Sequence, residues 1–257
     1  MRKTFDVVLN LMPVILALAS QPIHATQLAY EGFTPSFPVY ANGGTGFNGP
    51  WTGTPGYGSF VPLDGSLCYL RFPSSAGSIT ASPSNPQPAF AVAQRLLAQS
   101  IGADNTTVYI SFLIQPTGPF SNQDEYFGIS LNGLFIGKPG MGASTQYVIE
   151  NYGGGGQVPS GKQVAPRRTT LLVVKAQFLP GDDQFTLYVD PMPGQPEPAT
   201  GVTKSDLDVG TVLSIIVVSA MFTSGVTLDE IRIGTTYADV VPNIPFPASI
   251  FACLADN

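Results

Sequence analysis

Few side chains in this chain can perform acid–base or nucleophilic chemistry. The only histidine is His24, and a leader is expected to be removed after Ala25, so the exported chain carries no imidazole. That count excludes Ser-His-Asp and Cys-His catalysis and histidine metal sites. The adjacent carboxylates Asp124-Glu125 and Asp229-Glu230 point to opposite faces of a strand, and no Glu-x-Asp-x-x-Glu spacing occurs. The sequence predicts no enzyme, although a carboxylate pair assembled from distant strands stays open as an alternative.

Two segments carry the residue types of carbohydrate sites, an aromatic platform with amide or carboxylate groups beside it. The first segment, in a glycine-rich N-terminal loop, contributes Asn48, Trp51 and Tyr57. The second, beside the glycine run 153–156, contributes Tyr147, Glu150, Asn151 and Tyr152. For Trp51 the alternative is a structural role, in which its side chain is buried and fills the edge of the sandwich, because tryptophan is highly buried on average.

Calcium is the one metal to consider, because it needs only oxygen ligands, and no other cofactor is indicated. Its candidate ligands are Asp182 and Asp183 in a turn, and Asp206 and Asp208 in the loop before Val212. The alternative is that these turn aspartates accept hydrogen bonds from backbone amides.

A structural ion pair is predicted near the end of the chain. Glu230 and Arg232 are two residues apart, so they share one face of a strand. Arg232 can pair with Glu230 or with Glu31 on the opening strand, because sandwiches of this kind bring first and last strands together. Carboxylate–arginine pairing satisfies both groups, which favours a structural role over a ligand site.

The first 25 residues have the pattern of a secretory signal peptide. Arg2 and Lys3 precede an apolar run over residues 7–19, which is too short for a membrane-spanning helix of about 20 residues. Cleavage after Ala25 would deliver the chain to the periplasm, the cell surface or the medium. In such an oxidising compartment Cys68 and Cys253 are predicted to form a disulfide, with two free thiols as the alternative.

Composition points to a globular protein of many short strands. Charged residues make up 11% of the chain, while Gly (28) and Pro (24) are abundant, which suits strands joined by tight turns. The net charge of −6 argues against nucleic-acid binding, because little would displace counterions from phosphates. The apolar run over 212–222 is too short to cross a membrane as a helix and suits a strand covered on both faces.

Alternating apolar and polar residues predict about eleven strands. The clearest hairpin joins residues 171–179 to 185–189 through the turn-forming residues 180–183. The other predicted strands are 28–33, 67–72, 90–97, 108–114, 125–131, 134–137, 146–150, 212–222 and 226–233. This number of strands predicts an all-β, two-sheet antiparallel jelly-roll sandwich over residues 26–241, followed by an extended proline-rich tail over 242–257.

Three stretches resemble a known family. They are Tyr30-Glu31-Gly32-Phe33 with Asn42-Gly43-Gly44-Thr45-Gly46-Phe47 and Gly49-Pro50-Trp51, then Phe135-Ile136-Gly137-Lys138-Pro139, then Leu228-Asp229-Glu230-Ile231-Arg232-Ile233-Gly234-Thr235-Thr236-Tyr237-Ala238-Asp239-Val240. The set is similar to secreted bacterial surface-sorted (PEP-CTERM-type) proteins with a concanavalin A-like, laminin-G-like jelly roll. The resemblance implies a fold and not an activity. Residues 246–257 lack the apolar stretch and basic cluster of anchored members, so no anchor is carried over.

Three functional hypotheses follow. The first is a non-catalytic exported sandwich that binds carbohydrate or extracellular matrix at the bacterial surface. The second is a structural or adhesive surface protein without a sugar site. The third is a glycan-active hydrolase or lyase, which would need two carboxyl groups about 5–10 Å apart in a groove. No nucleic-acid partner and no transmembrane segment in the mature chain are predicted.

Overall fold

The structure is a computed structural model. It describes residues 26–33, 43–54, 57–81, 89–118, 125–140, 144–221 and 225–243. The predicted signal peptide, Cys253 and most of the predicted C-terminal tail lie outside the described residues. None of the helices in the described part of the chain has the length and hydropathy needed to cross a bilayer.

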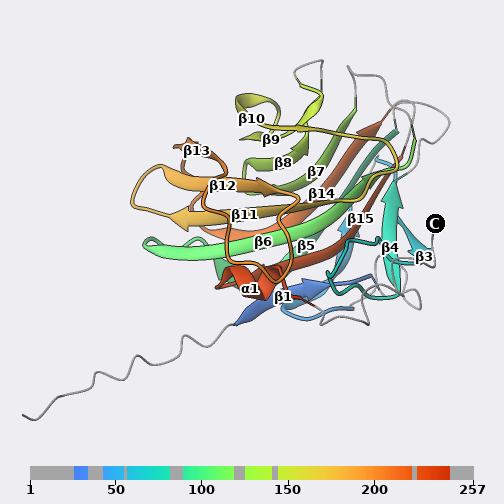
Figure 1. Cartoon of the computed structure of the whole chain (residues 1–257), viewed down its shortest axis with the longest axis horizontal. Coiled ribbons are helices and arrows are strands. Elements are labelled where there is room, and N and C mark those ends of the chain that lie inside the picture. The colour runs from blue at the N-terminus through green and yellow to red at the C-terminus, as the bar shows by residue number, and fades with distance from the viewer. Residues whose placement is uncertain are drawn as a thin grey trace, which may run out of the picture.

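The described strands form two antiparallel sheets (Figure 1). The first, which we call sheet A, has the order β13 (Val202–Leu207), β12 (Asp183–Val189), β11 (Thr170–Phe178), β6 (Thr106–Pro116), β15 (Val226–Gly234), β4 (Gly77–Ala81) and β3 (Val61–Asp64), with β1 (Gln27–Glu31) also paired to β15. The second, sheet B, has the order β10 (Gly155–Gln163), β9 (Gln146–Asn151), β8 (Leu134–Lys138), β7 (Tyr126–Leu131), β14 (Val212–Met221), β5 (Ala89–Ile101) and β2 (Phe47–Gly53). The predicted all-β jelly-roll sandwich is confirmed.

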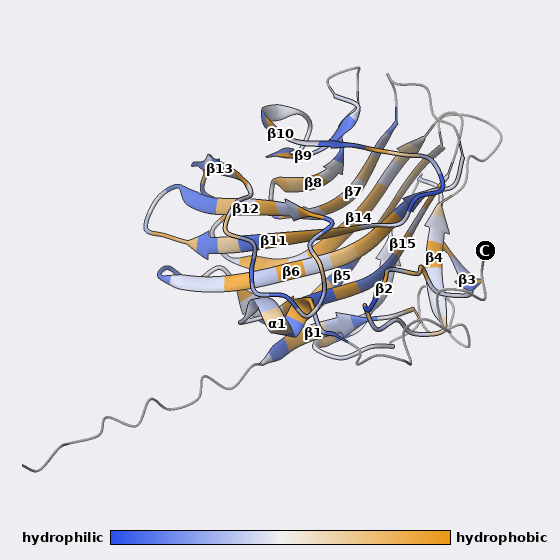
Figure 2. Cartoon of the chain, in the orientation of Figure 1, coloured by the Kyte–Doolittle hydropathy of each residue, from blue (hydrophilic) through white to orange (hydrophobic). Residues whose placement is uncertain are grey.

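The main core lies between the two sheets, where every second residue of a strand points inward. Figure 2 shows hydrophobic residues along the central strands of both sheets. Phe112 of β6, Val174 of β11, Ile129 of β7 and Val217 of β14 are all fully buried in it. The next residue of β14, Val218, is also buried, but in a separate cluster on the other side of sheet B. Strand β14 is therefore covered on both faces, as predicted from its continuous apolar sequence.

The outer face of sheet A is covered by a short helix and a loop segment, and neither was predicted to lie there. The short helix α1 (Tyr237–Val240) begins at a capping box on Thr236 and packs Val240 against Leu113 and Leu171 of the sheet. The segment 67–72 packs there too. It was predicted to be a strand, and this is wrong, because Arg71 has a positive φ of 63° and the Phe72 N–H donates to the Tyr69 carbonyl at 2.9 Å in a turn.

The two strand pairings that were predicted from the sequence are both present. The strands β11 and β12 form the expected hairpin, with Val174 opposite Leu187. The opening strand β1 pairs with the last strand β15, with Tyr30 opposite Arg232. Cys68 lies in the loop between β3 and β4 and is disulfide-bonded.

Candidate functional site

The outer face of sheet B carries a set of aromatic side chains that we call the outer aromatic cluster, consisting of Tyr57, Phe90, Tyr126, Phe135 and Tyr152. Phe135 and Tyr126 belong to an apolar group that is separate from the core between the sheets. Their rings stack with centroids 4.1 Å apart and an interplanar angle of 18°. This stack forms an apolar floor on the outer face.

Two glycines make room for this floor. Gly128 of β7 and Gly137 of β8 lie directly opposite each other in the strand register. A Cβ on Gly137 would come within 2.9 Å of the Phe135 ring, and one on Gly128 would lie 2.8 Å from the Gly137 Cα. The absence of side chains at these two positions therefore allows the Phe135 ring to lie across the sheet against Tyr126. This explains why glycine follows Phe-Ile in the Phe-Ile-Gly-Lys stretch.

The two exposed tyrosines of the cluster come from the two segments that the sequence analysis proposed separately. Tyr152, in the turn between β9 and β10, is 48% exposed and packs its ring edge-on against Tyr126 at 6.0 Å. Tyr57, in the loop between β2 and β3, is 50% exposed and packs edge-on against Phe90 at 5.8 Å. Burial raises the pKa of Tyr152, and the Tyr57 phenol raises it further. Phe90 and Tyr126 both lie opposite Ala220 of β14, so the two tyrosines pack against neighbouring rings of one face.

A buried carboxylate lies beside the aromatic floor. Glu150 of β9 is opposite Phe135 of β8 and is fully buried. Its Oε2 accepts a hydrogen bond of 2.6 Å from the Gln157 side-chain amide on β10. Its Oε1 is buried without a hydrogen-bond partner among the described residues. Buried acceptors are normally satisfied, so this oxygen suits a hydroxyl-bearing ligand. The predicted ligand residue Asn151 lies opposite the inward-facing Leu134 and therefore points away from the outer face.

Glu150 should make stability depend on pH in a defined direction. Burial raises its pKa, and the hydrogen bond from Gln157 and the charge of Lys204 only partly offset this. The folded state then holds the proton more tightly than the unfolded state, so stability falls as pH rises above about 4.3, the ordinary pKa of glutamate. Glu150→Gln should therefore raise the melting temperature at pH 7–8, and the gain should shrink toward pH 4.

Glu197→Gln serves as the matched control with the opposite sign. Burial would raise the pKa of Glu197, but hydrogen bonds from Tyr188, Tyr109 and Lys175 lower it overall. Its contribution to stability is therefore present above the ordinary pKa and lost as pH falls, so this variant should lower the melting temperature at neutral pH. Melting curves from pH 4 to 8 test both variants, and equal pH profiles for the two would contradict the assignment.

Three other predicted ligand-binding residues are also not part of this site. Trp51 is 1% exposed and donates its indole N–H to Glu31 Oε2 at 3.1 Å, so it is the structural plug that was the alternative interpretation. Tyr147 points into the core between the sheets, because it alternates with the outward-facing Val148. Asn48 is exposed on the edge strand β2, and the contacts recorded for the described residues do not link it to the cluster.

The candidate calcium ligands are engaged in other ways. Both carboxylate oxygens of Asp183 accept backbone hydrogen bonds of 2.9 Å, one from the Leu179 N–H and one from the Val209 N–H. Asp206 pairs with the buried ammonium of Lys204, and Asp208 accepts from the Gly210 N–H at 2.9 Å. Asp182 is exposed in the turn. Within the described ranges no group of three or more ligating side chains gathers that could hold a metal ion.

The predicted ion-pair residues lie in two separate buried groups. Glu230 pairs with Arg232, and its other oxygen accepts from the Tyr30 hydroxyl at 3.1 Å. Glu31 pairs instead with Arg95 of β5, joining the opening strand of sheet A to sheet B. The sequence analysis did not predict a role for Arg95, because it is the one charged residue of a mostly apolar strand.

Two parts of the site were missed in the sequence. The floor residues Tyr126 and Phe135 were assigned to strands but not to a surface. Their signal was available, because both stand at the outward positions of strands whose inward positions are apolar. Gln157 was missed because it lies in a glycine-rich stretch that reads as a loop, whereas the chain forms β10 there.

The fold is shared with several solved structures, although no protein-family profile and no curated protein matches the chain by sequence. The globular domain of T. cruzi calreticulin matches with a TM-score of 0.56 and 11% identity, over 90% of this chain and 97% of that one. Two further structures match with a TM-score of 0.51. One is an endo-1,3-beta-glucanase from Streptomyces sioyaensis at 9% identity, over 84% of this chain and 98% of its own. The other is a carbohydrate esterase from the Shiga toxin-encoding bacteriophage phi24B at 11% identity, over 82% and 99%.

These identities establish the architecture alone. The chain is a two-sheet β-sandwich of the kind found in lectin-like and glucanase domains. The same architecture supports binding and catalytic proteins, so function must be argued from the particular side chains of a site.

Proposed function

We propose that this chain is an exported, non-catalytic sandwich that binds a glycan of the bacterial surface or extracellular matrix on the outer face of sheet B. The observation that carries the proposal is the packing of Tyr57 and Tyr152, two half-exposed aromatic rings, against Phe90 and Tyr126 on one face of the sheet. Aromatic rings with an apolar body and a polar tip suit the faces of sugar rings, which combine C–H groups and hydroxyls.

The polar groups of the face support the same ligand class. A sugar hydroxyl can donate to Glu150 Oε1, a buried acceptor without a partner among the described residues. A few placed polar groups on an apolar platform are the usual composition of a small-molecule or saccharide site. The glucanase and the carbohydrate esterase among the structural neighbours act on glycans by their names, which supports the ligand class and says nothing of catalysis in this chain.

A glycan array with the full chain tests the proposal. The wild type should bind a defined subset of glycans, and Tyr57→Ala and Tyr152→Ala should each weaken binding about tenfold or more, as loss of an aromatic anchor does. Met192→Ala is the matched control, because Met192 is 60% exposed in the loop after β12 and belongs to no part of the cluster. Unchanged binding in both tyrosine variants would overturn the site.

Catalysis is tested with the same glycans. The ligands found on the array should be recovered intact after long incubation with the wild type, as measured by release of reducing ends. Their cleavage by the wild type but not by Glu150→Gln would replace the binding proposal with a glycan-active enzyme.

A further inference from the structure

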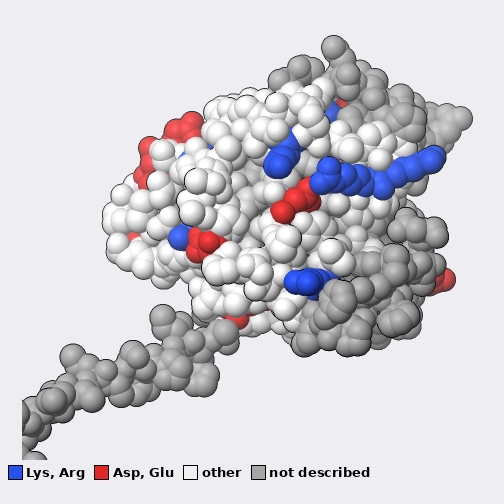
Figure 3. All heavy atoms as spheres, viewed as in Figure 1, with Lys and Arg blue, Asp and Glu red and all other residues white. Residues whose placement is uncertain are grey.

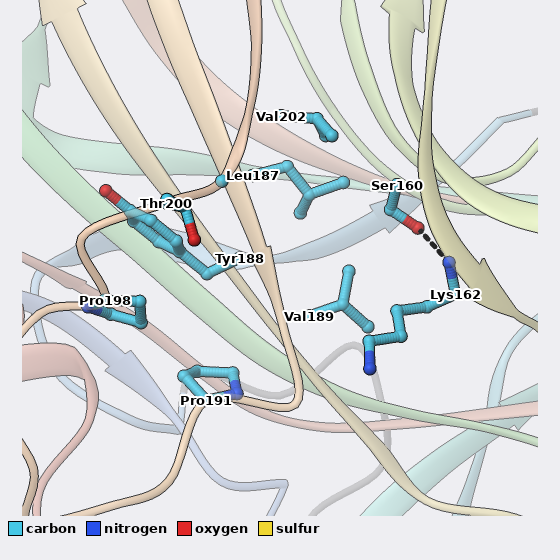
Figure 4. Close-up of a pocket in the computed structure, with 10 residues that line it drawn as sticks. Ser160, Lys162, Leu187, Tyr188, Val189, Pro191, Pro198, Thr200 and Val202 are labelled. Carbon is cyan, nitrogen blue, oxygen red and sulfur yellow. Dashed lines mark hydrogen bonds between the residues drawn. The ribbon is translucent and has the colours of Figure 1, made fainter.

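A pocket unrelated to the outer aromatic cluster lies at the edge of the sandwich, where β10 of sheet B passes β12 and β13 of sheet A. Its volume is about 310 Å³, which is at the lower end of the range for small-ligand sites. Figure 4 shows Tyr188 and Thr200 on one wall and Ser160 and Lys162 on the other, with Leu187 and Val189 between them.

The pocket has an apolar body. Leu187, Val189 and Val202 supply aliphatic groups, and Pro191 and Pro198 supply flat ring edges. Tyr188 also lines the pocket, but its ring packs edge-on against Tyr237 on the outer face of sheet A and its hydroxyl donates to Glu197 Oε1 at 2.7 Å. The walls therefore favour a ligand with C–H-rich faces about the size of one or two six-membered rings.

Lys162 supplies the only charge among the residues that line the pocket. No described residue forms an ion pair or hydrogen bond with its ammonium group, and its backbone N–H donates to the Ser160 hydroxyl. The neighbouring carboxylate, Asp190, is occupied by the Arg168 guanidinium at 2.6 Å and the Leu171 N–H at 3.2 Å. The Lys162 ammonium thus remains available to a ligand.

The overall charge of the chain does not favour anions. The protein has a net charge of −6, and charged side chains are sparse on the face that Figure 3 shows. General attraction will therefore not bring an anion to this surface, and any anion that binds must be held by a local contact. A cation beside an apolar pocket is such a contact.

We propose that this pocket is a second binding site, which takes a ring-sized ligand carrying one carboxylate, with the carboxylate on Lys162 and the ring against the aliphatic and proline side chains that line the pocket. Two sources share this chemistry, a hexuronate residue of an acidic glycan and a free cyclic carboxylic acid. The proposal does not depend on the function of the outer aromatic cluster, because the two sites share no residue.

Four probes test the site by isothermal titration or by NMR of the full chain. They are methyl glucuronoside, cyclohexanecarboxylate, and their uncharged counterparts methyl glucoside and cyclohexylmethanol. One or both acids should bind with a Kd of about 1 mM, as expected for so few atoms, and the uncharged probes should bind about tenfold more weakly or not at all. Binding of the glucuronoside alone identifies the glycan source, and binding of cyclohexanecarboxylate alone identifies the free acid.

Two variants separate charge from shape. Lys162→Met keeps the length of the side chain and should weaken binding of the acid about tenfold, whereas Thr200→Phe fills the pocket and should abolish it with Lys162 intact. Arg167→Met is the control, because Arg167 is an exposed cation in the loop before β11 that does not line the pocket. Melting temperatures verify that each variant folds. No binding of either acid, equal binding of charged and uncharged probes, or wild-type affinity in Lys162→Met would overturn the proposal.

Discussion

Replacing Arg95 by methionine is expected to lower the free energy of unfolding by about 3–5 kcal/mol, the cost of breaking a buried ion pair by removing one partner. The side chain of Arg95 is 1% exposed and that of Glu31 is 5% exposed. Arg95 also donates its Nε–H to the Gly49 carbonyl at 3.0 Å and lies 4.3 Å above the Phe47 ring. Methionine fills a similar volume but leaves the Glu31 carboxylate buried without its cation.

Denaturant unfolding at pH 7 measures this loss, and a surface pair supplies the control. Arg168 is 62% exposed where it pairs with Asp190, so Arg168→Met should cost less than about 1 kcal/mol. The double variant Glu31→Gln with Arg95→Met should regain part of the loss, because the uncompensated charge is gone. A cost for Arg95→Met no larger than that for Arg168→Met would show that the buried pair does not hold the two sheets together.

Strands whose two faces differ were predictable from the sequence. Val108–Ile114 alternates because its inward residues fill the core and its outward ones pack under helix α1 and the segment 67–72, and this region lies within β6. Strand β10 could not be predicted, because Gly155, Gly156 and Pro159 have low strand propensity and are held by pairing with β9. Strand β13 was missed for a related reason, since Lys204 is buried by a contact with the Gly156 carbonyl at 2.9 Å that only tertiary structure provides.

The sequence predicted individual residues of the candidate site but not that they lie on one face. Tyr57 and Tyr152 were both selected as aromatic residues in glycine-rich loops, but 95 residues of chain separate them and no local pattern indicates that they meet. Their meeting depends on β5 and β9 belonging to one sheet, which is a matter of strand order. Trp51 was selected by the same criterion and is buried, because its partner Glu31 lies on another strand.

Replacing Asp183 by alanine is expected to lower the free energy of unfolding by about 2–3 kcal/mol, because a buried backbone donor loses its partner. Asp183 is 2% exposed and ties the β11–β12 turn to the loop after β13 through the N–H groups of Leu179 and Val209. Val209 is 3% exposed, so water cannot readily replace the carboxylate there. Leu179 is 40% exposed, and its N–H can be hydrated at little cost.

The neighbouring residue and a chelator separate this explanation from a calcium site. Asp182→Ala removes an exposed carboxylate from the same turn and should change stability by no more than about 0.5 kcal/mol. If Asp183 acts through backbone hydrogen bonds, its substitution costs the same with added calcium and with a chelator, and the wild-type melting temperature does not respond to either. A ligand that binds only the folded state stabilises it in proportion to the logarithm of its concentration. A melting temperature that rises with calcium in the wild type, but not in Asp183→Ala, would therefore assign the carboxylate to a metal rather than to the two amides.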